Sequence, residues 1–225
     1  MARAPTFRLT RGQRKLAIDL GIVVVGVFIA LVAQQAVQSM DWRAQVRDAR
    51  KALRAELAYD VGAYDIRVRQ SDCVQHRLDE LQAWLDRWKA GHGRPLGPIG
   101  RIYTFSLYNS VWNVVQSGQV ATHFPLAERV EYAGMYDNLR NVDEQNAKTS
   151  EAWAVVRAYQ GVGNLDHRDF VQIGGALSQL RLADKVIREN GPGYILSSAE
   201  RLKVRPETLP LPGPTDELCR PLPQT

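Results

Sequence analysis

The hydrophobic pattern of the chain begins with an apolar run over residues 20–33 (LGIVVVGVFIALVA), which contains no charged residue. A basic arm without any acid before Asp19 precedes this run; its basic residues are Arg3, Arg8, Arg11, Arg14 and Lys15. As a helix the run would cover roughly 21 Å, which is short of the about 30 Å of a bilayer core. Extension over residues 16–40 reaches that length. We therefore predict a basic arm over residues 1–15 and a transmembrane anchor over 16–40.

Two other interpretations of the apolar run stay open. A basic segment before a short apolar stretch is also typical of a cleaved signal peptide, although the residues at 34–36 and 37–39 make poor cleavage sites. A buried helix of a soluble core is the other alternative, which the acid-free basic arm disfavours.

The orientation of the anchor does not follow from charge counting, because the arm before it and residues 41–54 after it each contain five Lys and Arg residues. Long domains cross the membrane largely regardless of their charge, whereas the arm is short and acid-free. We therefore expect a single-pass protein of the bacterial inner membrane, with the N-terminus in the cytoplasm and the downstream domain in the periplasm.

Downstream of the anchor, apolar residues recur every three or four positions, which is the helical period. A first stripe continues the anchor helix outward and consists of Trp42, Val46, Ala49, Leu53, Leu57 and Val61. A second stripe ends at the GHGRPLGP sequence of residues 91–98 and consists of Val74, Leu78, Leu81, Leu85 and Trp88. A third helix is predicted over residues 104–117, with Gly118 as its left-handed terminator. A fourth stripe, from Leu126 to Tyr159, predicts one long helix or two in tandem.

A fifth helix is predicted to begin at Asp166, as its cap, and to end at the Gly-Pro-Gly sequence of residues 191–193. The SSAE sequence at 197–200 fits a capping box for a short last helix. Six of the eleven prolines follow Arg205, which predicts an extended tail over residues 205–225. The predicted fold is all-α: a single transmembrane helix, an α-helical bundle domain over residues 41–204 and an extended proline-rich C-terminal tail.

Charge and cysteine content add to this picture. The chain has a formal net charge of +5, and its basic clusters flank the apolar run. Such clusters favour the lipid bilayer as a partner, because they attract anionic headgroups. The sequence shows no motif for nucleic acid. Cys73 and Cys219 either form a disulfide in an oxidising compartment or are two unrelated thiols.

The sequence offers no defensible catalytic, cofactor or metal motif. The four histidines, His76, His92, His123 and His167, are dispersed without the spacing of paired metal ligands. The glycine pairs lack the strand and the third glycine of a dinucleotide loop. We therefore expect no enzyme activity, no cofactor and no metal.

One aromatic group has two interpretations. Several rings with polar tips, together with two asparagines, would converge on packed helices; the residues are Tyr108, Asn109, Trp112, Asn113, Tyr132 and Tyr136. Such a stripe is by default the core of a helical bundle. The alternative is a ligand pocket in which the asparagines supply hydrogen bonds.

Several short motifs resemble those of a known family. They are IAL at 29–31 with the later Trp42, LRAEL at 53–57, YNSVW at 108–112, QSG at 116–118 and YAGMY at 132–136. Over residues 15–160 the chain resembles a family of uncharacterised bacterial single-pass membrane proteins, a domain of unknown function, although its tryptophan stands further from the anchor than in that family. The resemblance implies an N-terminal anchor and a helical domain, and it implies no chemistry.

These patterns favour one function class and leave a second open. We expect a membrane-anchored, non-enzymatic envelope protein that binds a protein partner or self-associates as a homo-oligomer. The alternative is a helical ligand-binding or sensory module with its pocket around Trp112 and Tyr136.

Overall fold

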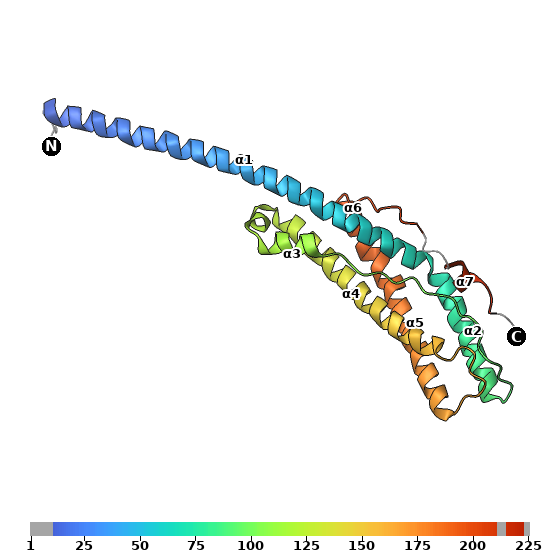
Figure 1. Ribbon diagram of the computed structural model, residues 1–225. Coiled ribbons are helices and arrows are strands. Elements are labelled where there is room, and N and C mark those ends of the chain that lie inside the picture. Colours follow the sequence, from blue (N-terminus) through green and yellow to red (C-terminus); the bar gives the residue numbers. More distant parts are fainter. Residues whose placement is uncertain (1–10, 211–214, 223–225) are drawn as a thin grey trace, which may run out of the picture. The chain divides into compact units, whose positions relative to one another are not determined.

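The computed structural model describes residues 11–210 and 215–222, and its regular elements are helices (Figure 1). The first, α1 (Arg11–Arg69), is a single helix of 59 residues, so the apolar run and the amphipathic stripe after it are continuous as predicted. In the described part of the chain no strand forms, and Leu96 and Gln160 make one isolated bridge. The all-α prediction is therefore confirmed.

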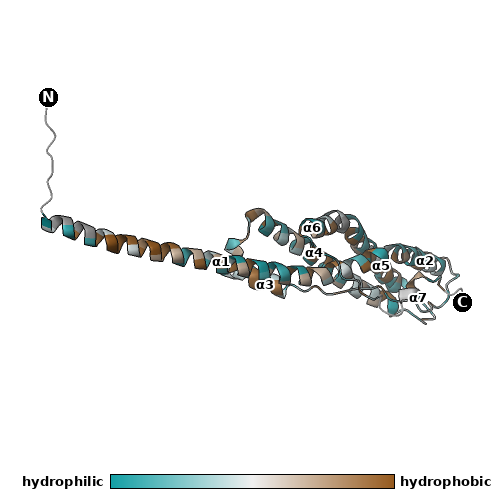
Figure 2. Cartoon of the chain, turned by 90° about the horizontal axis from the view of Figure 1, so that it is seen from above, coloured by the Kyte–Doolittle hydropathy of each residue, from teal (hydrophilic) through white to brown (hydrophobic). Residues whose placement is uncertain are grey.

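The chain divides into two compact units, Met1–Asp48 and Ala49–Thr225. In the first unit, α1 displays a band of hydrophobic residues (Figure 2). These side chains are exposed, as Phe28 at 67 % and Leu20 at 64 % illustrate. Among the described residues, α1 is the one helix that is long and apolar enough to cross a membrane. A membrane anchor and a signal sequence share that property.

The second unit has a hydrophobic core. Its main elements are α2 (Ser71–Lys89), α4 (Leu126–Arg157) and α5 (His167–Gly191), together with the second half of α1. Figure 1 shows α4 and α5 side by side, and α2 and α5 are also in contact. Leu78, Leu81 and Leu177 are fully buried, and burial of each such side chain stabilises the fold by about 1.5–3 kcal/mol.

The segment before α3 (Ser110–Ser117) is extended, so the prediction of helix from residue 104 is wrong for its first six residues. Side chains of α1 and of the turn after it satisfy its backbone instead: the Tyr103 N–H donates to Gln70 at 2.7 Å, and the Tyr108 N–H donates to Asp60 at 3.1 Å. These partners replace the hydrogen bonds that a helix would have made. After α3, Gly118 has φ −89°, so it is not the predicted left-handed terminator; it leads into the 3-10 helix η1 (Gln119–His123).

The α-helix α5 ends at Gly191, at the predicted Gly-Pro-Gly sequence, but the chain stays helical beyond it. The chain continues through a π-helix, η2 (Pro192–Leu196), into α6 (Ser197–Arg201). A π-helical turn accommodates Pro192, which has no backbone N–H to donate. Ser197 is consequently not a cap, because its hydroxyl donates back to the Gly193 carbonyl at 2.5 Å. The prediction of a capping box there is wrong.

Other helix ends follow the sequence signals. The stripe from Leu126 forms one helix, α4, which ends at Arg157. Asp166 caps α5: its Oδ1 accepts the N–H groups of Arg168 at 2.7 Å and Asp169 at 3.0 Å. Such a cap satisfies backbone donors that have no partner within the helix.

The tail is only partly extended. A short helix, α7 (Thr215–Cys219), lies within the region predicted to be extended, while residues 211–214 and 223–225 fall outside the described part. A disulfide joins Cys219 to Cys73 of α2. The buried guanidinium of Arg77 donates to the carbonyls of Glu217 at 3.0 Å and Leu218 at 3.1 Å. These contacts satisfy the C-terminal carbonyls of α7, which explains why so short a helix forms there.

Candidate functional site

The aromatic residues predicted to gather at α3 and α4 do so in part. Trp112 stacks on Tyr136 with ring centroids 5.2 Å apart, and Tyr132 lies 6.3 Å from Trp112. All three are buried, with exposed fractions of 6 %, 3 % and 0 % for Trp112, Tyr136 and Tyr132. Phe124 completes the cluster with an edge contact on Tyr132. The three rings are therefore core, as the default interpretation held.

The other candidate pocket residues lie elsewhere. Tyr108 is 55 % exposed and packs edge-on against Tyr59, with ring centroids 5.0 Å apart. Asn109 and Asn113 are exposed and bond to each other, the Asn113 amide donating at 3.2 Å. A pocket lined jointly by these residues and Tyr136 is not what the structure shows. The physical reason is that residues 104–109 are extended, so Tyr108 and Asn109 do not share a helical face with Trp112.

Glu56 of α1 connects α1, α3 and α4. Its carboxylate accepts the hydroxyl of Tyr136 at 2.7 Å, the N–H of Val111 at 2.9 Å and the hydroxyl of Ser110 at 3.1 Å. The Trp112 N–H donates to the same carboxylate at 3.4 Å. Glu56 thus caps α3 from another helix, because it supplies an acceptor for the first free N–H groups of α3. Burial, and secondarily the bond to Glu56, raise the pKa of Tyr136, which therefore stays a donor.

Asp60 lies one turn further along α1 and is fully buried. Its Oδ1 accepts the Tyr108 N–H at 3.1 Å, whereas Oδ2 has no hydrogen-bond partner among the described residues. Burial raises the pKa of Asp60 to about 7, and the nearby carboxylates of Glu56 and Asp143 add to this effect. Asp60 therefore carries a proton over much of the acidic range.

An apolar groove adjoins the aromatic cluster on the side of η1 and the start of α4. Its volume is about 330 Å³, and it is lined by Trp112, Val115, Gln116, Ala121, Phe124, Leu126, Arg129, Val130, Tyr132 and Ala133. Leu126 and Val130 on its rim are 66 % and 61 % exposed. Among the described residues no partner of the Arg129 side chain is found. The groove therefore offers an apolar floor with one unpaired cation at its edge.

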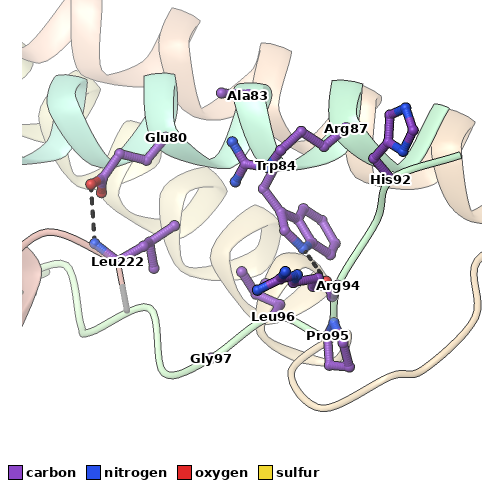
Figure 3. Close-up of a pocket in the computed structure, with 10 residues that line it drawn as sticks. All are labelled: Glu80, Ala83, Trp84, Arg87, His92, Arg94, Pro95, Leu96, Gly97 and Leu222. Carbon is purple, nitrogen blue, oxygen red and sulfur yellow. Dashed lines mark hydrogen bonds between the residues drawn. The ribbon is translucent and has the colours of Figure 1, made fainter. Parts of the chain in front are cut away.

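A second, larger cavity lies between α2 and the loop that follows it (Figure 3). Its volume is about 510 Å³, and it is lined by Glu80, Ala83, Trp84, Arg87, His92, Arg94, Pro95, Leu96, Gly97 and Leu222. Trp84 reaches from α2 toward the loop, where its Nε1–H donates to the Arg94 carbonyl at 2.8 Å. The sequence analysis did not identify this cavity, because its lining comes from three separate segments.

No protein-family model, curated protein or solved structure matches the chain. Over the described residues, the fold and the sites define an all-α protein with one candidate membrane-spanning helix near its N-terminus. The resemblance to a family of single-pass membrane proteins stays a prediction. Three of its motifs nevertheless meet in space, since Glu56 of LRAEL bonds to Trp112 of YNSVW and to Tyr136 of YAGMY.

Proposed function

We propose that the protein is a membrane-anchored, non-enzymatic envelope protein that binds a protein partner through the groove of α3, η1 and α4. The N-terminal apolar part of α1 is the anchor, with the N-terminus in the cytoplasm and the second unit in the periplasm. The Cys73–Cys219 disulfide supports this location, because disulfides persist in oxidising compartments.

The single observation that carries the partner-binding function is the exposed apolar surface of the groove. Leu126 and Val130 are 66 % and 61 % exposed beside a floor of buried aromatic rings. Grouped apolar side chains that stay in water are typical of interaction sites.

The chemistry of the groove defines the partner. Its floor accepts apolar side chains, and Arg129 at the rim pairs with a carboxylate. We infer that the occupant is a protein segment with an apolar stripe flanked by an acidic residue. A small-molecule pocket at Tyr136 is less favoured, because Tyr136 does not line the groove and its hydroxyl is bonded to Glu56.

The experiment is in-cell photocrosslinking with the full chain, using a photoreactive residue at position 130 and, as a matched control, at position 171. Val171 of α5 is 64 % exposed and does not line the groove. We expect an adduct with a second protein from position 130 only, and its loss in an Arg129→Glu background. Adducts equal at both positions, or insensitive to Arg129→Glu, would contradict the proposal. An adduct with another copy of the chain would contradict a separate partner and would show that the groove mediates self-association.

A further inference from the structure

The cavity between α2 and residues 92–97 is distinct from the partner groove and is lined by basic groups. Arg87, His92 and Arg94 all line it. Among the described residues, none of these three side chains has a hydrogen-bond or ion-pair partner. Unpaired guanidinium groups beside one cavity create a positive potential that favours an anion.

The acid in the cavity wall, Glu80, contacts groups other than Arg87 and Arg94. Glu80 accepts the Leu222 N–H at 3.0 Å, and Figure 3 shows its carboxylate turned toward Leu222. Glu80 Oε2 lies 3.4 Å from Nε of Arg77, and Nε2 of His76 lies 3.5 Å from Glu80 Oε1. The Glu80 carboxylate is therefore engaged with the tail and with its own helix.

The remaining wall is apolar and held in place. Trp84 and Leu96 are only 4 % and 3 % exposed. The Trp84 indole donates a hydrogen bond to the Arg94 carbonyl, which holds the ring in place. The Trp88 indole donates to the same carbonyl at 2.9 Å. Pro95 and Leu222 complete the apolar side. A rigid apolar wall beside guanidinium groups matches a ligand that has an apolar body and an anionic end.

The volume is suited to such a molecule, because small-ligand sites usually measure about 300–1,000 Å³ and this cavity measures about 510 Å³. We propose that it is a binding site for a small anionic ligand, a carboxylate or a phosphate carried on an apolar body. The apolar wall at Pro95 and Leu222 takes the body, and Arg87 and Arg94 take the anion as bidentate donors. This site is independent of the partner groove.

The test is calorimetric titration of the full chain in detergent micelles with four probes: 2-naphthoate, 2-naphthyl phosphate, uncharged 2-naphthamide and inorganic phosphate. We expect saturable binding of 2-naphthoate or 2-naphthyl phosphate. The anion that binds more tightly identifies the anionic group of the ligand as a carboxylate or a phosphate. Naphthamide and inorganic phosphate should each bind at least about tenfold more weakly, because each lacks one half of the recognition.

Variants locate the binding. Arg87→Gln and Arg94→Gln should each weaken binding of the naphthyl anion by about tenfold or more. The control Arg157→Gln, an exposed arginine of α4 that does not line the cavity, should bind as the parent does. Thermal melting of each variant checks that the fold is retained. Failure of both naphthyl anions to bind would overturn the proposal. So would equal binding of naphthamide or of inorganic phosphate, or binding that neither substitution weakens.

Discussion

Arg67 of α1 and Asp184 of α5 form an ion pair of 2.8 Å whose two side chains are 0 % and 1 % exposed. Ser71 and Gln75 donate to the same carboxylate at 3.3 Å and 2.6 Å. The carboxylate therefore has three donors, which offsets the cost of removing both charges from water. The pair fixes the position of α5 against the end of α1 and the start of α2.

Removal of one member of this pair should be more harmful than removal of both. Asp184→Ala should lower the free energy of unfolding by about 3–5 kcal/mol, because it leaves the Arg67 charge buried without a partner. The double variant Arg67→Met with Asp184→Leu should recover most of that loss. Urea unfolding of the three proteins measures both effects. A double variant as unstable as Asp184→Ala would contradict this account.

Asp60 should make stability dependent on pH. Its pKa is raised to about 7 in the folded protein from the ordinary value of 3.8, so between these values the folded state binds a proton that the unfolded state has lost. Stability therefore falls as the pH rises from about 4 to about 7 and levels off above that. Each pKa unit corresponds to about 1.4 kcal/mol.

Asp60→Asn, which cannot titrate, should remove this contribution. The variant should gain stability relative to the parent as the pH is raised from about 5 to about 8, and thermal melting at the two values measures the gain. Asp65→Asn is the control, because Asp65 lies on the same helix with a side chain that is 46 % exposed. Parallel pH profiles for Asp60→Asn and the parent would refute the assignment.

Glu56→Ala should loosen α3. It removes the acceptor of the Val111 and Trp112 N–H groups and of the Tyr136 hydroxyl, and each buried donor left without a partner costs about 1–3 kcal/mol. Hydrogen exchange of the amides of α3 should become faster. Glu56→Gln keeps an acceptor oxygen and should show a smaller increase. Unchanged exchange in Glu56→Ala would mean that α3 does not depend on this cap.

The sequence predicted the long helices and missed the polar core. Apolar stripes identified α1, α2, α4 and α5 because their period is local. Asp60 lies on the buried stripe of Leu57 and Tyr64, and a carboxylate on an apolar face was the available signal of a buried acid. Its partner is the backbone of Tyr108, 48 residues away, which local periodicity cannot show.

The errors at helix ends have the same origin. Residues 104–109 are extended because side chains from α1 and α4 bond their backbone, as Asn146 does with the Phe105 carbonyl at 3.3 Å. The chain stays helical beyond Gly191, which lies in close contact with Tyr64, whose hydroxyl donates to the Ile187 carbonyl at 2.9 Å. In both places tertiary contacts override the local signal.

Val24→Arg tests the anchor. A charge at the centre of the apolar run should cost about 2.5–3.5 kcal/mol of insertion free energy. The variant should leave the membrane fraction on alkaline carbonate washing or be degraded, whereas the control Val24→Leu should be retained. Retention of Val24→Arg in the washed membranes would argue against residues 20–33 as the spanning segment.

Trp112→Ala tests the aromatic core beneath the groove. Trp112 is 6 % exposed and stacks on Tyr136, so its truncation should lower the free energy of unfolding by about 3–5 kcal/mol. Val114→Ala is the matched control, because Val114 lies on the same helix with 71 % of its side chain exposed, and it should change stability by less than about 0.5 kcal/mol. Urea unfolding of the full chain compares the two. An unchanged midpoint for Trp112→Ala would show that Trp112 serves the groove as a contact residue and does not support the core.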